Sequence, residues 1–327
     1  MSKPIESLKN FNITDKDIEK LKLLGINTIQ SLHMTSRKSL LNIKGFTEKK
    51  VSNIFNEANK IEVFSLFQKG SDLMNQRYNN IRRISTGSRN LDNIIGGGFE
   101  SNSITELIGE KNVIITDFIH ILTVNAKKQN SNNKIIFFDL ENNFNKEKII
   151  SLAKEMNINR KNCLGNIILI NEVDTFDDLM SKLNEISENN QCSECSLLII
   201  DSLITIFQKL FKETLIHKSQ INNELGNKYD IESKLGKILT ILKRISILYN
   251  MAIIITRIIN DDENMNAQND LIKSDPNIEI ILNYECKTRL KFKKLKNDKI
   301  KCIVLNSPMI SEQDCKFIIT EKGIIDC

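Results

Sequence analysis

The sequence predicts an α/β protein with a mostly parallel central sheet, preceded by a small all-α domain. Two patterns lead to this fold class. From residue 84 onward, short β-rich runs alternate with stretches of helical spacing, the order expected when helices cover both faces of a parallel sheet. Before residue 61, the apolar residues recur at helical spacing instead.

The strand candidates of the core, residues 84–327, include several runs that are apolar throughout, as expected of strands covered on both faces. The five strand candidates are residues 103–108, 134–139, 166–170, 196–201 and 251–256. Helical patterns separate these runs at 146–155, 175–187 and 231–249. Near the end of the chain, two further strand patterns flank the turn-forming pair Asn297 and Asp298. This arrangement predicts an antiparallel hairpin at the end of the sheet.

Residues 1–60 predict the helical domain, and residues 61–83 a linker. Asp15 is placed to cap a first helix and Gly25 to end it. Two later helices are joined by the tight turn Ile43-Lys44-Gly45, which resembles a helix-hairpin-helix module. In such a turn, the backbone N–H groups around Lys44 and Gly45 can hold a DNA phosphate. Alternatively, this is a packing domain in which Gly45 only supplies the turn.

Composition places the 327-residue chain among ordinary soluble proteins, with 40% hydrophobic and 27% charged residues. The net charge of +5 permits nucleic-acid binding without demonstrating it. The polar opening segment lacks the apolar core of a secretory signal, and no apolar run approaches the roughly 18 residues of a membrane span. The seven cysteines are scattered, which favours a reducing compartment. Cys192 and Cys195 form one pair with no second pair to complete a zinc site, so an exposed loop is expected there.

Three strand ends carry the residues expected of a nucleotide site, because ligands of parallel sheets bind beyond the carboxyl ends of the strands. One strand runs into a turn at Gly109, the place for a phosphate loop. Another ends at Asp201, an acid placed to bind Mg²⁺, and a third leads to Glu141, a carboxylate that can polarise an attacking water. Alternatively, each acid only solvates a strand end.

These motifs, taken with others in the same order, resemble the eukaryotic and archaeal RecA-like strand-exchange recombinases, especially their meiotic branch. The resemblance covers nearly the whole chain and lies in residues 41–45, 84–88, 91–92, 96–101, 104–106, 109–110, 139–144, 201–202, 274–276, 288–289 and 307–308. It implies a RecA-like, P-loop-type core and location in the nucleus. It also implies that the protein forms filaments on single-stranded DNA, and that these filaments pair the bound strand with double-stranded DNA. Membrane association is not expected.

The resemblance also implies a site for ATP and Mg²⁺. Glu141 corresponds to the catalytic, water-activating glutamate of the family. The nucleotide would be bound by Gly109, Glu110, Thr116 and Asp201, and the metal by Thr116 and Asp201. Where the site has lost function, no cofactor is expected.

The phosphate loop departs from the family pattern G-x-x-x-x-G-K-S/T, since residues 109–116 read GEKNVIIT. Ile114 replaces a glycine where the turn is tight, and Ile115 replaces the lysine that contacts the β- and γ-phosphates. Losing that charge-assisted hydrogen bond costs about 1.5–3 kcal/mol, a tenfold to hundredfold loss of affinity. Asp117 adds a negative charge at the start of the helix, where the dipole should favour phosphate. Lys111 lies before the turn and would have to reach back, so tight ATP binding is not expected.

Other departures concern the elements that link ATP to DNA in the family. Arg257 and Ile258 replace an Asn-Gln pair, and Asn145 and Lys148 stand where basic residues follow the catalytic glutamate. The family's Pro-Ile-Gly-Gly stretch is absent, because Pro276 runs into Asn-Ile-Glu-Ile.

DNA contacts are expected from basic residues in two loops, 208–228 and 257–273, and in the late hairpin, although the second loop also holds three consecutive acids. Together with Lys44 and Gly45, the residues assigned to DNA are Lys209, Lys212, Lys218, Arg257 and Arg289. Alternatively, the lysines of the hairpin only protect a sheet edge from pairing.

Phe67 and Gly70 resemble the Phe-x-x-Ala element with which family members polymerise head to tail into a helical filament. Alternatively, the phenylalanines of the linker pack on the preceding helix. Two functions remain open at this point. One is a recombinase that binds DNA and exchanges strands with ATP; the other is a non-catalytic paralogue that mediates or joins the filament of an active recombinase.

Overall fold

The computed structural model describes residues 3–11, 13–61, 70–71, 74, 80–109, 112–130, 132–188, 192, 194–209, 224–258, 276–308 and 310–327. The chain divides into two compact units, Met1–Asn79 and Asn80–Cys327. The smaller unit is helical, and the larger unit holds the sheet.

The small unit packs short helices around one apolar core. Its elements are the 3-10 helix η1 (Ile5–Phe11) and the helices α1 (Asp15–Leu23), α2 (Ile29–Met34), α3 (Arg37–Leu41) and α4 (Glu48–Ile61). Thr28 and Ser36 begin α2 and α3, because each side chain accepts a hydrogen bond from the backbone N–H three residues later. Gly45, with a φ of +92°, supplies the left-handed residue in the turn between α3 and α4.

The large unit is built around a nine-stranded sheet among the described residues, in the order β11-β10-β9-β8-β3-β7-β6-β4-β5. Its strands are β3 (Ser103–Gly109), β4 (Lys134–Asp139), β5 (Ile167–Ile170), β6 (Cys195–Asp201), β7 (Ala252–Ile258), β8 (Thr288–Lys294), β9 (Lys299–Asn306), β10 (Asp314–Thr320) and β11 (Gly323–Asp326). Six neighbouring strands, β8, β3, β7, β6, β4 and β5, run parallel to one another. Beyond β8, the strands β9, β10 and β11 continue the sheet with antiparallel pairing. A separate antiparallel pair, β1 (Arg83–Ile84) and β2 (Phe99–Glu100), lies at the entry to the unit.

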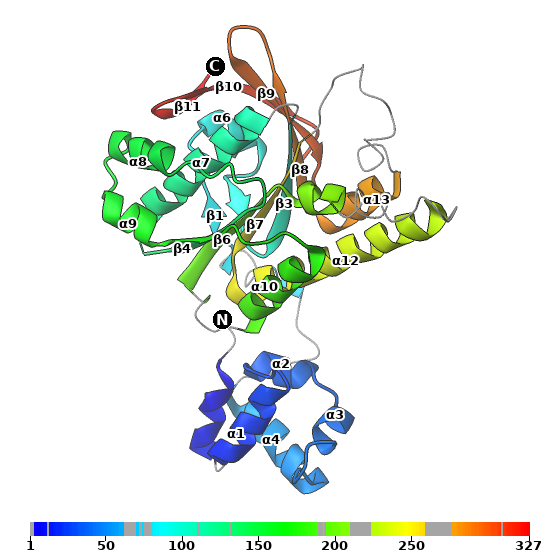
Figure 1. Cartoon of the computed structure of the whole chain (residues 1–327). Coiled ribbons are helices and arrows are strands. Elements are labelled where there is room, and N and C mark those ends of the chain that lie inside the picture. The colour runs from blue at the N-terminus through cyan, green and yellow to red at the C-terminus, as the bar shows by residue number, and fades with distance from the viewer. Residues whose placement is uncertain are drawn as a thin grey trace. The chain divides into compact units, whose positions relative to one another are not determined.

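Helices cover both faces of the sheet (Figure 1). They are α6 (Arg89–Ile94), α7 (Asn112–Gln129), α8 (Lys146–Glu155), α9 (Arg160–Gly165), α10 (Phe176–Glu188), α12 (Glu224–Tyr249) and α13 (Pro276–Glu285). One face packs against α10, α12 and α13, and the other against α6 and α7, with α8 and α9 behind α7. Each face therefore has its own hydrophobic core.

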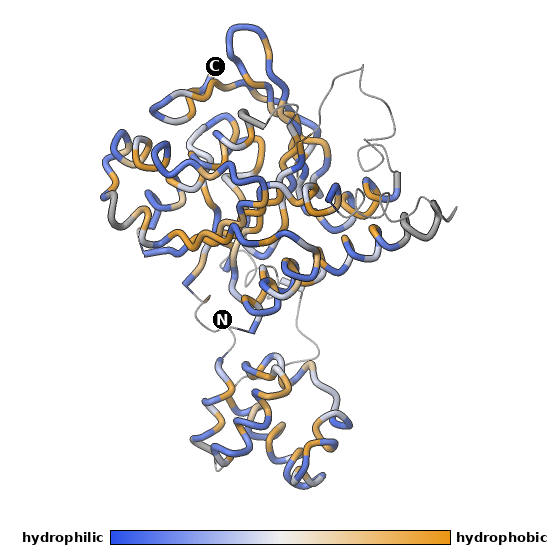
Figure 2. The backbone as a smooth tube through the Cα atoms, in the orientation of Figure 1, coloured by the Kyte–Doolittle hydropathy of each residue, from blue (hydrophilic) through white to orange (hydrophobic). Residues whose placement is uncertain are grey.

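Alternation along the strands supplies both cores at once. Ile136 and Phe138 of β4 belong to one core, and Ile135 and Phe137 to the other, since successive side chains leave a strand on opposite faces. This explains why the central strands are buried along nearly their whole length and mostly apolar, as Figure 2 shows along the sheet.

The fold class predicted from the sequence is confirmed. The predicted hairpin corresponds to β8 and β9, and both Asn297 and Asp298 adopt positive φ in its turn. Helix α12 begins at Glu224, seven residues before the predicted start, because the apolar spacing that signals a helix begins only at Ile231. Within the described part of the chain, no helix has the length and apolar character of a membrane span.

Candidate functional site

The candidate site lies at the carboxyl ends of β3, β4 and β6, which meet at one edge of the sheet. Gly109 is the last residue of β3, and Asp139 and Asp201 are partners at the ends of β4 and β6. Glu141 follows β4, and Thr116 lies in the first turns of α7. The fold thus brings Gly109, Thr116, Glu141 and Asp201 to the same edge. Glu110 lies outside the described residues.

The phosphate loop is filled by an apolar side chain of its own. Ile115, at the position of the family lysine, is 0% exposed and belongs to the core between α7 and the sheet. It lies against Gly109, since a Cβ atom built on that glycine would be 2.5 Å from Cδ1 of Ile115. Helix α7 begins at Asn112, so residues 112–116, part of the phosphate-loop motif in the family, are helical here. At the position of the family lysine, the described structure therefore offers phosphate an apolar side chain and no cation.

The side chain of Asp201 is fully buried. Its Oδ1 accepts a hydrogen bond from the hydroxyl of Thr256 at 2.6 Å. Burial raises the pKa of Asp201 to about 7, assisted by the charges of Glu141 and Asp139 and opposed by the hydroxyl of Thr256.

Two buried oxygen atoms of this site are Oδ2 of Asp201 and Oγ1 of Thr116. Neither has a hydrogen bond of normal geometry among the described residues. The Thr116 hydroxyl nevertheless lowers the pKa of Asp201, which shows that it is close. Hydroxyl and carboxylate oxygens are ligands that Mg²⁺ accepts, so this pair fits a magnesium ion. The described residues contain no cluster of three or more His, Cys, Asp or Glu that could hold a metal, so water or phosphate would have to complete the coordination.

The two acids that follow β4 have different local roles. Both carboxyl oxygens of Asp139 accept backbone hydrogen bonds, from the N–H groups of Asn143 and Phe144 at 2.8 and 3.0 Å, so Asp139 shapes the turn. Glu141 accepts hydrogen bonds from the Thr205 hydroxyl at 2.7 Å and from the Asn143 amide at 2.9 Å. Neutral donors thus hold the predicted catalytic carboxylate in place.

The expectation that Asp117 repels phosphate needs a correction. Asp117 forms an ion pair with Lys148 of α8, so its negative charge is balanced within the protein. The pair links the beginning of α7 to the beginning of α8. The departures of this site from the family pattern are therefore Ile115 and the start of α7 at Asn112, and not an unpaired acid at residue 117.

The comparisons with known proteins agree with this geometry. The family model described as Rad51 matches residues 76–327. The meiotic recombination protein DMC1/LIM15 homolog of Mus musculus is 30% identical over 98% of this chain and 92% of its own length. The meiotic recombination protein DMC1 homolog A of Oryza sativa subsp. japonica is 31% identical over 98% and 90%, and the DNA repair protein RAD51 of Saccharomyces cerevisiae 28% identical over 99% and 78%.

The chain belongs to the Rad51 family. The resemblance stated from the sequence motifs is thereby confirmed, and the RecA-like assignment of the core with it.

The residues that the sequence assigned to DNA are dispersed in this Rad51-family structure. Lys44 and Gly45 are exposed in the turn between α3 and α4, and the amino group of Lys20 donates to the Lys44 carbonyl at 2.7 Å. Lys209 is partly exposed at the end of the short helix after β6 and pairs with Asp174 at 3.0 Å. Lys212 and Lys218 lie outside the described residues, as does Phe67 of the polymerisation element, whereas Gly70 is described and exposed.

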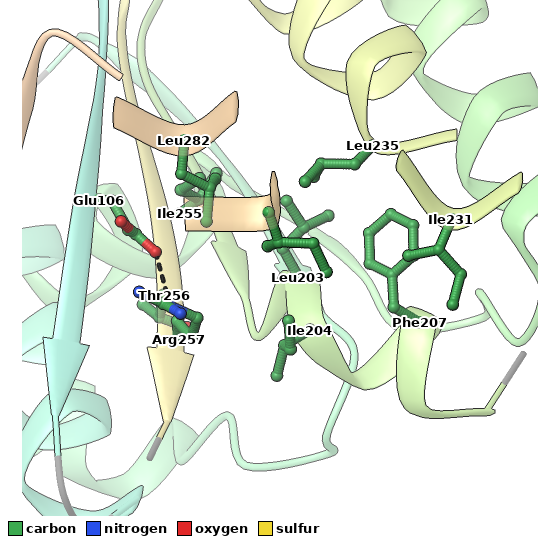
Figure 3. Close-up of a pocket in the computed structure, with 11 residues that line it drawn as sticks. Glu106, Leu203, Ile204, Phe207, Ile231, Leu235, Ile255, Thr256, Arg257 and Leu282 are labelled. Atoms are coloured by element: carbon green, nitrogen blue, oxygen red, sulfur yellow. Dashed lines mark ion pairs between the residues drawn. The ribbon is translucent and has the colours of Figure 1, made fainter. Parts of the chain in front are cut away.

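Arg257 and Arg289 lie in the interior, only 4% and 2% exposed. Glu106 of β3 and Glu279 of α13 neutralise them. Figure 3 shows the pair of Arg257 and Glu106 at the edge of a small apolar cavity of about 20 Å³, below α12 and α13. Neither guanidinium group faces solvent, so both arginines are left out of the DNA-contacting set proposed below.

His120 is a residue near the site that the sequence did not reveal. Its Nε2 accepts a hydrogen bond from the backbone N–H of Asn145 at 3.1 Å, and its ring packs on Phe137 and Phe144. Burial lowers the pKa of His120 to about 4, so the ring is neutral at physiological pH and supports the start of α8. A lone histidine in an apolar helix carries no signal from which this contact can be read.

Proposed function

We propose that this Rad51-family chain is a DNA-binding protein of homologous recombination and DNA repair that acts in the nucleus as a non-catalytic partner in recombinase filaments. The names of its relatives describe meiotic recombination and DNA repair. Their similarity spans nearly the whole chain, which supports the same process here. The non-catalytic role rests on the state of the phosphate site.

The observation that carries this proposal is the burial of Ile115 against Gly109. A lysine in that position contributes a charge-assisted hydrogen bond to the phosphates, about 1.5–3 kcal/mol. Because Ile115 is also part of the core below α7, the loop cannot reopen without exposing apolar surface. Weak ATP binding is therefore built into the packing and does not depend on one missing charge.

The remaining acids support a narrower role for metal. Thr116 and Asp201 would hold a magnesium ion, and Glu141 would lie near it. When bound, the ion supplies positive charge for phosphate oxygens. In a filament, a neighbouring subunit completes such a site, so weak binding of MgATP at an interface is compatible with the proposed role.

The proposed DNA contacts are lysines of the small unit and of the segment after β6, together with Gly45. Lys44 and Gly45 would hold a phosphate at the helix-hairpin-helix turn, and Lys209, Lys212 and Lys218 would neutralise phosphates of single-stranded or double-stranded DNA. Phe67 and Gly70 are proposed to join this chain to a copy of itself or to an active recombinase, in an open head-to-tail assembly.

The decisive experiment is equilibrium binding of a fluorescent ATP analogue with Mg²⁺, with and without single-stranded DNA. We expect no micromolar binding by the natural protein and a gain of at least about tenfold in the double variant Ile114→Gly/Ile115→Lys. The matched control is Ile114→Gly/Ile115→Met, which introduces the same glycine and a side chain of similar length without charge. Micromolar binding by the natural protein would restore the alternative of an ATP-driven recombinase.

A further inference from the structure

Four charged side chains from four separate elements meet inside the large unit. Glu106 comes from β3, Arg257 from β7, Arg289 from β8 and Glu279 from the first turns of α13. The first three are at most 4% exposed, whereas Glu279 closes the cluster from its outer side. Two arginines and two glutamates balance each other, so the cluster needs no outside ion.

The contacts form a closed ring. Glu106 lies 2.8 Å from Nε of Arg257 and 2.5 Å from Nε of Arg289. Glu279 lies 2.6 Å from Nη1 of Arg257 and 2.7 Å from Nη2 of Arg289. Arg289 also donates to Asn283 of α13. Burial alone would raise the pKa of Glu279, but the charges of the two arginines and the hydrogen bond from Arg289 outweigh it and hold that pKa below its ordinary value.

The ring connects the two ends of one chain segment. Arg257 is the penultimate residue of β7, and Glu279 lies in the first turns of α13, while residues 259–275 between them are outside the described part of the chain. Glu106 belongs to β3, the strand that leads to Gly109. The ring thus fastens the end of β7 and the beginning of α13 to the strand that leads to the nucleotide site; Figure 3 shows the part of it formed by Glu106 and Arg257.

Two members of the ring are departures from the family pattern that the sequence shows separately. Arg257 replaces a neutral residue, and Glu279 lies in the stretch that replaces Pro-Ile-Gly-Gly. In the structure these two residues contact each other at 2.6 Å. With both departures present, the cluster holds two positive and two negative charges and is balanced, whereas Arg257 alone would leave it with one excess positive charge and Glu279 alone with one excess negative charge.

We propose that Arg257 and Glu279 form a permanent ionic latch that positions the end of β7 and the beginning of α13 without nucleotide, so that the affinity for DNA is the same with and without ATP. The part of this proposal that concerns DNA rests on the proposed function. In this chain, fixed charges hold these two elements in the position that a bound nucleotide would otherwise have to maintain. The loss of nucleotide binding that Ile115 causes would then not reduce the affinity for DNA.

The latch is tested first by hydrogen exchange of the backbone amides in α13, which requires no DNA. In the natural protein we expect equal protection with and without MgATP. In Glu279→Gln, exchange in α13 should rise at least about tenfold, because the ring loses one of its two negative charges. The matched control is Glu285→Gln on the same helix, which removes the pair with Lys243 outside the ring and should change exchange by less than about threefold. Unchanged exchange in Glu279→Gln would overturn the latch.

The second measurement is fluorescence anisotropy of labelled single-stranded DNA. The natural protein should bind with an affinity that MgATP changes by less than about twofold, and Glu279→Gln should bind at least about tenfold more weakly. An increase of tenfold or more with MgATP would refute the nucleotide-independent latch. If the natural protein binds no DNA, the proposed function fails, while the exchange experiment still decides whether the latch exists.

A double variant that leaves the net charge of the ring unchanged tests the latch in a protein that stays folded. Arg257→Gln/Glu279→Gln removes one positive and one negative charge together, leaving the pair of Glu106 and Arg289 balanced. It should melt within a few degrees of the natural protein by circular dichroism, yet show the increased exchange in α13. Natural protection of α13 in this folded variant would also contradict the latch.

Discussion

Replacing Lys127 with methionine should stabilise the protein at neutral pH. Lys127 lies in α7, only 1% exposed, and its amino group has no hydrogen-bond partner among the described residues. Burial lowers its pKa from 10.5 to about 8, and the thiols of Cys163 and Cys195 oppose the shift only weakly. Burial also raises the pKa of Cys163, so that this thiol stays neutral at pH 7 and offers no counter-charge.

The magnitude and its pH dependence follow from the two pKa values. A shift from 10.5 to about 8, at about 1.4 kcal/mol per unit, is an upper limit of about 3 kcal/mol. Partial solvent screening reduces this to an expected gain of about 2 kcal/mol. Between pH 8 and 10.5 the unfolded chain binds the proton and the folded protein does not, so the stability of the natural protein rises with pH in this window. The gain in Lys127→Met is therefore complete below pH 8 and disappears near pH 10.5.

The assay is urea unfolding followed by circular dichroism at pH 7 and pH 10, with the free energy extrapolated to water. The control is Lys128→Met, the same substitution at the exposed neighbouring residue, which should change stability by less than about 0.5 kcal/mol. A loss of stability at pH 7 would mean that the ammonium group of Lys127 has a stabilising partner, and a gain that stays constant up to pH 10 would mean that the gain does not come from the buried charge; either result would refute the reasoning.

Three further predictions concern the site, the ionic ring and DNA. Gly109→Ala should destabilise the protein by about 1–3 kcal/mol in urea unfolding, because the new methyl group meets Ile115, and adding Ile115→Val should recover part of the loss. Arg289→Ala should cost about 3–5 kcal/mol, since it leaves the ring with excess negative charge around Glu106, and a loss below 1 kcal/mol would contradict the buried pairing. Lys44→Ala should weaken DNA binding in titrations at several salt concentrations and reduce the salt slope by about one, whereas an unchanged slope would remove Lys44 from the interface.

The fold was largely readable from the sequence because its signals are local. Apolar runs such as 134–139 can be satisfied only as buried strands, and β4 occupies those residues. The beginning of α12 was missed because its first turn has no apolar spacing. Whether residues 61–83 are a linker, and whether Phe67 and Gly70 join subunits, stay predictions.

The candidate site was only partly predictable. Motif order identified the residues at the strand ends, and the family match confirmed the resemblance on which their roles were proposed. The partners of those residues were not predictable, since Thr205, Thr256 and Lys148 approach from other elements. Sequence also suggested that Arg257 faces DNA, because a basic residue beside a loop is usually solvated.

By itself, the sequence determined the alternation of strands and helices, the family, and the loss of the lysine and glycine from the phosphate loop. These are properties of residue type and spacing along the chain. Only the tertiary structure shows that Ile115 packs against Gly109. Only the tertiary structure shows, too, that Arg257 and Glu279, which are separate departures in the sequence, form an ion pair. The physical reason is that the free energy of a buried charge or methyl group depends on the atoms that surround it in space, and those come from strands and helices far apart in the chain.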